Sequence, residues 1–278
     1  MPLLFSNSRI RLPLGQLFWR EIGRSPTTLV FLHGSSRDSS QWIPLLERLG
    51  ENYHCLAVDL LGFGDSERVD RHYSVQLLVE SFASYLEALR LERVYLVGHS
   101  LGGWVATHYA LQHPERVRGL ILISPSGVSV QGDAKHQAWE KLLVSRFSWL
   151  TVLLRSLRPL AKFGGWKPKI DRVLAHRQEL LQCPTTCDLL LRRSQREIEA
   201  EYLDPRLERL KVPTLILQGN DGNPSDRFRS QVYAKLIPNA QLRLLADTGD
   251  DLLALKCDRA AVEIREFLAT EGKQKFKN

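Results

Sequence analysis

Short apolar runs alternate with helical patterns along most of the chain, and this alternation limits the fold more than any other feature. Apolar runs at residues 27–33, 94–98 and 119–124 are separated by helical patterns at residues 74–91 and 101–113. Strands without polar alternation are typical of a parallel sheet that is covered on both faces. Similar segments elsewhere are a strand at 53–60, strands at 214–219 and 241–246, and helices near 228–237 and 258–269. The sequence therefore predicts an α/β fold with a mostly parallel sheet flanked by helices.

A long helical segment interrupts this alternation between about residues 128 and 211. It is rich in Trp, Leu and Arg, and it returns to an apolar strand pattern only at residues 214–219. We interpret it as an insertion into one core rather than as a separate folding unit. The expected organisation is a core formed by residues 1–128 and 207–278, with a helical lid at residues 129–206.

Composition excludes several classes of protein. With 44% hydrophobic and 25% charged residues among 278, the chain has the balance of a folded globular protein, not of a disordered or fibrous one. No run of 18 apolar residues occurs, so we expect no membrane-spanning helix. The first residues lack the pattern of a secretory signal, and the four cysteines are few. We therefore expect reduced thiols and a cytoplasmic location.

Residues 98–103 read Gly-His-Ser-Leu-Gly-Gly and match the pattern G-x-S-x-G between a predicted strand and a predicted helix. A sharp turn of this kind forces Ser100 into strained dihedral angles, and Gly98 and Gly102 leave room for it. The hydroxyl then stands clear of the sheet edge. The N-terminus of the following helix points its amides at the same place, which suits a developing negative charge. The pattern predicts Ser100 as a catalytic nucleophile.

The chain resembles the α/β-hydrolase superfamily at this turn, in particular the branch of lid-bearing esterases, lipases and C–C hydrolases. Residues 59–66 match the turn D-x-x-G-x-G-x-S, and residues 33–36, His-Gly-Ser-Ser, follow the strand after which the family places its second oxyanion amide. The resemblance implies an eight-stranded type of sheet. It also implies an oxyanion hole formed by the amides of Ser35 and Leu101. His33 and His99 belong to these motifs, and we expect them to orient the loops.

The resemblance also implies an acid after the strand at residues 214–219, where the chain departs from the usual pattern. The expected position is Gly222, and Asp221 lies one residue early. We favour Asp221 as the acid and keep Asp226 as the alternative. Both aspartates lie in a cluster of Asn, Asp, Gly and Pro that would also form an ordinary turn.

The family's histidine is absent from its expected position, which is occupied by Asp250, and no histidine follows His176. A serine without a base is a poor nucleophile, and an aspartate accepts a proton weakly at neutral pH. Two carboxylates that face each other can share one proton, so Asp221 and Asp250 together remain a candidate weak base. The pair could instead hold a cation, although two carboxylates alone are few ligands for one.

Histidines elsewhere in the chain are the other candidates for a base. His136 and His176 lie in the predicted lid, and His72 follows the turn at residues 59–66. Each of the three also fits a solvated or capping role. Cys183 and Cys187 lack a second pair of ligands at zinc spacing, so we expect neither a metal nor a cofactor.

The predicted lid carries most of the positive charge. Residues 135–196 contain 13 Lys and Arg against four Asp and Glu, a net charge of +9, whereas the whole chain has a net charge of +7. Within it, residues 147–169 combine leucines at helical spacing with basic and aromatic residues, as interfacial helices do. The segment suits a lipid-like ligand or contact with an anionic membrane surface; the same leucines would also simply cover a pocket. No nucleic-acid motif accompanies the charge, so we expect no nucleic-acid partner.

Two functions fit these observations. The first is a serine hydrolase that acts on a carboxylic ester or a related acyl bond, with lipid esters among the candidates, through an atypical triad. The second is a catalytically weak relative that keeps the fold and the pocket and binds a small molecule or lipid. Asp250 in place of histidine separates the two, because the first function needs a base from elsewhere.

Overall fold

Eight strands form one sheet in the order β1-β2-β4-β3-β5-β6-β7-β8. The computed structural model describes residues 4–130, 133–145, 153, 154, 156, 167–249 and 252–274. The strands are β1 (Ser6–Leu12), β2 (Gly15–Ile22), β3 (Thr28–Leu32), β4 (His54–Val58), β5 (Val94–His99), β6 (Val117–Ile123), β7 (Thr214–Gly219) and β8 (Ala240–Leu245). From β4 to β8 neighbouring strands are parallel, and β1, β2 and β4 pair antiparallel. The predicted mostly parallel sheet is therefore confirmed.

The central strands β3, β5 and β7 are almost wholly buried, as their sequence predicts, whereas β8 at the edge of the sheet is exposed at several positions. Every residue of β7 is buried, and only the first residue of β3 and the last of β5 are partly accessible. The two antiparallel strands at the start were not predicted from the sequence. In β1, polar residues such as Arg9 and Arg11 remain exposed, because this strand lies at the edge of the sheet.

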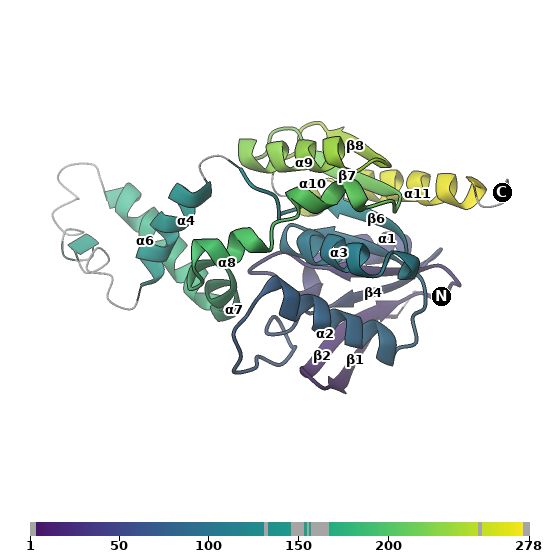
Figure 1. Cartoon of the computed structure of the whole chain (residues 1–278), viewed down its shortest axis with the longest axis horizontal. Helices are drawn as coiled ribbons and strands as arrows, with labels where there is room; N and C mark the ends of the chain where they lie inside the picture. The colour runs from purple at the N-terminus through teal and green to yellow at the C-terminus, as the bar shows by residue number, and fades with distance from the viewer. Residues whose placement is uncertain are drawn as a thin grey trace. The chain divides into compact units, whose positions relative to one another are not determined.

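Helices connect the strands and cover the sheet. Those that belong to the same unit as the sheet are η1 (Ser39–Trp42), α1 (Ile43–Leu49), α2 (Val75–Ala88), α3 (Leu101–Gln112), η2 (Pro114–Arg116), η5 (Asp204–Arg209), α9 (Pro224–Leu236), α10 (Leu252–Leu255) and α11 (Cys257–Gln274). Helix α2 packs against α3, and α1 packs against α11 (Figure 1). Ser74 caps α2 by accepting a hydrogen bond from the amide of Leu77 at 3.0 Å, as the sequence predicts.

One core cluster joins the sheet to α1 and α11. Phe31 and Val97 on neighbouring strands pack with Trp42, Leu46 and Ile264, all of them fully buried. The intervening strand residues point to the other face, because side chains alternate along a strand. Both faces of the central strands are thus covered, which explains why these strands contain almost no polar residues.

The chain divides into two compact units. The first comprises residues 1–70, 74–130 and 201–278, and the second comprises residues 71–73 and 131–200. The second unit contains α4 (Asp133–Val144), α6 (Lys167–Gln182), α7 (Pro184–Thr186), η4 (Cys187–Leu191) and α8 (Gln195–Ala200). Its small core is formed by Val144, Cys187 and Leu191. That this unit acts as a lid stays a prediction.

Much of the basic, leucine-rich segment 147–169 lies outside the described residues, which include only 153, 154, 156 and 167–169 of it. Within the described part of the chain, no helix is both long and apolar enough to cross a bilayer.

Candidate active site

Ser100 occupies a strained turn between β5 and α3. Its φ is +48° and its ψ is −112°, a conformation that a residue with a side chain rarely adopts. Such a conformation costs about 1–3 kcal/mol and persists only where the surroundings enforce it. Its amide donates to the carbonyl of Ile123 at 3.1 Å, and its carbonyl accepts from the amide of Trp104, also at 3.1 Å. The turn has the geometry that the G-x-S-x-G pattern predicts.

Two glycines make this turn sterically feasible. A Cβ at Gly102 would lie 2.0 Å from the carbonyl oxygen of Leu32, and one at Gly98 would lie 2.5 Å from the carbonyl oxygen of Gly102. Both distances are far below van der Waals contact with backbone atoms that cannot move aside. The start of α3 therefore packs directly on the end of β3, which brings the first turn of this helix next to the loop after β3.

A second serine contacts the hydroxyl of Ser100. The Oγ atoms of Ser100 and Ser126 are 3.1 Å apart, and the Ser126 amide donates to the Ser100 carbonyl at 3.1 Å. The buried Tyr233 of α9 donates its hydroxyl to the carbonyl of Ser126 at 2.6 Å. The loop after β6 is thereby fixed against the candidate nucleophile. Ser126 and Tyr233 were not predicted from the sequence, although Ser126 lies only three residues after the strand β6 that leads to this edge of the sheet.

The loop after β3 is held by a buried histidine. His33 donates from Nδ1 to the carbonyl of Gly34 at 2.8 Å and accepts the amide of Leu60 on Nε2 at 3.0 Å. Both ring nitrogens are used within these loops, which requires the neutral form. Burial lowers the pKa of His33, in agreement with this arrangement. The orienting role expected of His33 is therefore confirmed.

The predicted oxyanion amides lie on this loop and on the adjoining helix. The amides of Ser35 and Leu101 donate to no other described residue. A Cβ at Gly34 would approach Nδ1 of His99 to 2.7 Å, so the loop after β3 packs closely on the residue before Ser100. One amide lies on the loop after β3 and the other at the start of α3, and both remain available to donate to a negatively charged oxygen.

The turn at residues 59–66 fixes the loop after β4. The buried carboxylate of Asp59 accepts the amides of Ser39 at 2.5 Å and Asp65 at 2.7 Å. The hydroxyl of Ser66 donates to the Asp59 carbonyl at 2.6 Å and accepts the Phe18 amide at 2.9 Å. Gly64 has a φ of +51°, and a Cβ there would collide with the Asp59 carboxylate. The residues of this motif act structurally and hold the loop that follows β3.

The candidate acid Asp221 lies in the exposed loop after β7. Its amide donates to the carbonyl of Thr248 at 2.8 Å, and the amide of Asn220 donates to the carbonyl of Leu245 at 2.9 Å. The carboxylate of Asp221 forms no hydrogen bond or ion pair with another described residue. The alternative acid, Asp226, lies in the first turn of α9 and accepts a hydrogen bond from Arg229 of the same helix.

Asp250 lies outside the described residues, but the loop that leads to it is described up to Gly249. A Cβ at Gly219 would lie 2.4 Å from the carbonyl oxygen of Gly249, so the loops after β7 and β8 run side by side. The carboxyl ends of parallel strands meet at one edge of a sheet, so these loops belong to the same edge as Ser100. The structure gives no contact between the Ser100 side chain and Asp221.

Three histidines outside the loop after β3, namely His72, His108 and His176, have local partners. His72 lies 3.3 Å from the carboxylate of Glu197, and His176 lies 3.1 Å from that of Glu140, both within the second unit. His136 belongs to α4, and its side chain is outside the described part. His108 accepts a hydrogen bond from Arg206 at 3.2 Å; burial lowers its pKa, and the positive charge of Arg206 does so as well. His108 therefore has a structural role.

All four cysteines are free thiols. Burial raises the pKa of Cys55 to about 12 and that of Cys257 to about 11, which makes both unreactive at neutral pH. Among the residues that the structure describes, no group of three or more His, Cys, Asp or Glu side chains is arranged to hold a metal ion.

The fold and the nucleophile turn agree with a match to a known protein family. A sequence profile described as alpha/beta hydrolase fold matches residues 27–256, which is most of the chain. The chain therefore belongs to the alpha/beta hydrolase fold family, and the resemblance predicted from the sequence is confirmed.

Relatives in this family include lipid-processing proteins. The chain is 26% identical to the monoacylglycerol lipase ABHD6 of Bos taurus over 261 residues, which is 89% of this chain and 77% of that protein. It is 33% identical over 154 residues to a probable 1-acylglycerol-3-phosphate O-acyltransferase of Oryza sativa subsp. japonica, covering 51% of this chain. The match spans only about a third of the length of that protein (36%) and of a similar acyltransferase of Arabidopsis thaliana (32%).

Solved structures share the fold along nearly the whole chain. A bacterial membrane phospholipase A superposes with a TM-score of 0.73 at 25% identity, covering 96% of this chain and 86% of that one. A structure described as a putative lipase from Acinetobacter baumannii AYE gives a TM-score of 0.77 at 21% identity, covering 97% and 93%. The second likeness establishes the fold alone.

Proposed function

We propose that this protein is a serine hydrolase that acts on a carboxylic ester of a lipid or lipid-like molecule, with Ser100 as the nucleophile. The single observation that carries the proposal is the strained turn at Ser100, with a φ of +48°. An ordinary turn would relieve such strain by placing glycine at that position. Here the serine keeps it, and glycines fill the positions two residues before and two residues after.

In this reaction the Oγ atom of Ser100 attacks the ester carbonyl, and the carbonyl oxygen becomes negatively charged. The amides of Ser35 and Leu101 donate hydrogen bonds to that oxygen. Donors of this kind typically contribute about 2.7–4 kcal/mol each to transition-state stabilisation. The acyl group then remains on Ser100 while the alcohol leaves, and water later releases the acid.

The proton of Ser100 needs an acceptor, and we propose the carboxylate of Asp250, with Asp221 as the second carboxylate of a pair that shares one proton. In this step the Asp250 carboxylate takes the proton and then returns it to the departing alcohol. An aspartate does this far less well than histidine, because its pKa lies well below neutral pH. We therefore expect slow turnover. His72, His136 and His176 are the alternative bases, and each can be replaced individually to test this assignment.

Lipid esters are the proposed substrate class because of the relatives. ABHD6 is described as a monoacylglycerol lipase, and the solved neighbours include a membrane phospholipase A. The basic segment at residues 135–196 supports peripheral contact with an anionic membrane surface, since its net charge is +9. Binding to vesicles with and without anionic lipid, measured at low and at high salt, tests this contact.

A second candidate function is lipid or small-molecule binding with little turnover. The observation that favours it is Asp250 at the position where the family has histidine. In that case the fold and the oxyanion amides would hold a ligand without cleaving it.

The distinguishing experiment is the burst phase with p-nitrophenyl esters of four, eight and twelve carbons. Since deacylation also needs a base, we expect about one equivalent of p-nitrophenol per chain, followed by slow release. Mass spectrometry should then find the acyl group on Ser100. Ser84→Ala, on the exposed side of α2, is the matched control and should keep the burst. A burst that persists in Ser100→Ala would contradict the assignment, and the absence of any acyl-enzyme would favour the binding function.

A further inference from the structure

The second unit contains a cavity of its own. Its volume is about 740 Å³, which lies within the range of small-molecule sites. It is lined by Lys141, Val144, Ser145, Arg177, Leu181, Leu191 and Arg192. All seven residues belong to the second unit, and none is carboxylic. The cavity therefore combines cationic and apolar side chains without an acid in its lining.

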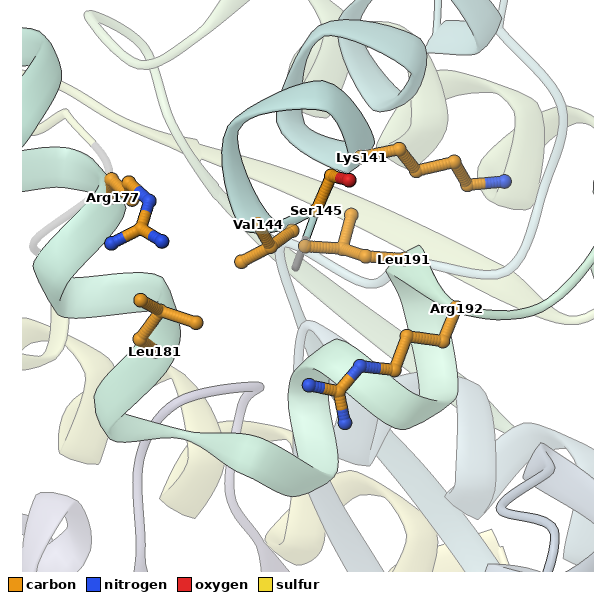
Figure 2. Close-up of a pocket in the computed structure, with 7 residues that line it drawn as sticks. All are labelled: Lys141, Val144, Ser145, Arg177, Leu181, Leu191 and Arg192. Carbon is orange, nitrogen blue, oxygen red and sulfur yellow. The ribbon is translucent and has the colours of Figure 1, made fainter. Parts of the chain in front are cut away.

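The two guanidinium groups come from different segments. Figure 2 shows Arg177 and Leu181 on one helix, α6, and Arg192, which directly follows η4, on another segment. Arg177 uses Nε to donate to the carbonyl of Leu143 at 2.8 Å, and its terminal nitrogens contact no acceptor among the described residues. Arg192 uses one terminal nitrogen for the carboxylate of Asp188 at 2.5 Å. Both side chains thus keep donors for a ligand.

Lys141 contributes differently. Its ammonium donates to the carbonyl of Arg193 at 2.9 Å, and Figure 2 shows it turned away from Arg177. Its stem therefore lines the cavity while its charge adds to the positive potential. The carboxylate of Asp188 offsets the charge of Arg192 only, so the three cationic side chains of the lining keep a net positive charge.

The apolar part of the lining is anchored in the small core of this unit. Val144 and Leu191 are buried members of that core, whereas Leu181 is 37% exposed. A π-helical turn shapes this side of the cavity. The amide of Arg192 donates to the carbonyl of Cys187, five residues earlier, at 2.8 Å. Such widened turns are frequent at functional sites.

From this arrangement we propose that the cavity binds a single-chain amphiphile with an oxyanion headgroup, either a carboxylate or a phosphate monoester. The planar donors of Arg177 and Arg192 match the oxygens of such a headgroup. Val144, Leu181 and Leu191 contact the first part of the alkyl chain. The site stands apart from the reaction proposed for Ser100, and its test does not depend on that reaction.

The test is calorimetric titration of the full chain with decyl phosphate and with decanoate, both below their micelle concentrations. We expect saturable binding of at least one of the two, and the stronger ligand identifies the headgroup. Inorganic phosphate represents the headgroup alone and decanol the alkyl chain alone. Each should bind at least about tenfold more weakly than the stronger of the two amphiphiles. Equal binding of decanol, equal binding of inorganic phosphate, or no binding of either amphiphile would overturn the proposal.

Variants locate the binding. Arg177→Gln should weaken it about tenfold or more, since a hydrogen bond to a charged group is lost. Arg172→Gln, an exposed change on the same helix outside the cavity, is the matched control and should leave the affinity unchanged. Leu181→Asn should reduce the gain from lengthening the chain from six to ten carbons. Ser100→Ala should bind normally, whereas loss of binding in that variant, or full binding in Arg177→Gln, would contradict the assignment to this cavity.

Discussion

The two halves of the candidate active site differ in how tightly the surrounding contacts hold their proposed catalytic residues. On the side of β3 and β5, Gly98, Gly102 and His33 fix the Ser100 turn and the adjoining loop through close backbone contacts and paired ring nitrogens. On the side of β7 and β8, Asp221 is exposed, and its carboxylate has no partner among the described residues. The first half therefore holds a strained nucleophile turn in place, whereas the second leaves its candidate acid exposed, although its two loops also pack closely at Gly219.

This difference separates what the fold requires from what the chemistry requires. The nucleophile turn also packs α3 against β3, so a mutation there affects both stability and activity. In the loop after β7, the carboxylate of Asp221 forms no hydrogen bond or ion pair with another described residue, so a substitution there should affect activity more than stability. We therefore expect mutations in the first half to lower both stability and activity, and mutations at Asp221 to lower mainly activity.

The largest effect is expected at Gly102. The Cβ of alanine there would lie 2.0 Å from the carbonyl oxygen of Leu32, and the helix and strand would have to separate. We expect Gly102→Ala to lower the free energy of unfolding by about 3 kcal/mol or more. Gly249→Ala is the control in the other half, since its Cβ would meet nothing closer than 3.6 Å among the described residues. Urea denaturation measures the free energy of unfolding of both variants. Equal losses of stability in Gly102→Ala and Gly249→Ala would refute the difference between the two halves.

The aspartates provide the next comparison. Asp59→Ala removes the acceptor of two buried amides, and we expect a loss of about 2–3 kcal/mol in the free energy of unfolding. Asp221→Asn should change it by less than about 0.5 kcal/mol, as for other exposed substitutions, while lowering the rate of esterolysis. Thermal denaturation and p-nitrophenyl ester turnover should be measured on both variants. A marked destabilisation by Asp221→Asn would assign that residue a structural role.

The pH dependence of stability should reflect the buried histidine of the first half. Burial lowers the pKa of His33, so below pH about 6.5 the unfolded chain binds a proton that the folded chain excludes. The contribution of neutral His33 to the free energy of unfolding is complete above that pH. It is lost as the pH falls, by up to about 1.4 kcal/mol per pH unit. Urea unfolding at pH 7.5, 6.5 and 5.5 measures this slope. His33→Asn should flatten it, and an unchanged slope would contradict the role of His33.

The smallest effect is expected at Ser126. Its hydroxyl lies 3.1 Å from that of Ser100 and orients it, so Ser126→Ala should lower the rate of Ser100 acylation by up to about tenfold. The stability should hardly change, because the Ser126 backbone hydrogen bonds remain. Burst kinetics with the eight-carbon ester provide the measurement. An unchanged burst rate would show that the contact between the two hydroxyls has no role in acylation.

The parallel strands were predictable because burial on both faces leaves a continuous apolar run. The predicted segment 214–219 has the same bounds as β7, and the segment at 27–33 contains β3. Strands β1 and β2 were not predicted, since β1 consists mostly of polar and charged residues and its pairing with β2 is decided by tertiary contacts. Helix α9 starts at Pro224, several residues before the expected start, because Asn223 caps it.

The nucleophile turn was predictable for a related reason: Gly98, Ser100 and Gly102 are forced by local geometry and therefore leave a local pattern. Ser126 and Tyr233 reach the site through tertiary packing from separate segments, and no spacing in the sequence indicates that they meet. The roles of Asp221 and Asp250 remain predictions, since the Asp221 carboxylate forms no hydrogen bond or ion pair with another described residue and Asp250 lies outside the described residues. The cavity around Arg177 and Arg192 likewise depends on how three helical segments pack.

The most direct test of the account is the rate at which a fluorophosphonate probe labels Ser100 in the native chain, in Ser100→Ala and in Asp250→His. The account predicts slow labelling of the native chain and none of Ser100→Ala. It predicts labelling of Asp250→His that is at least about 100-fold faster, because the first half of the site is complete and lacks only an efficient base. Equal rates for the native chain and Asp250→His, or persistent labelling of Ser100→Ala, would contradict it.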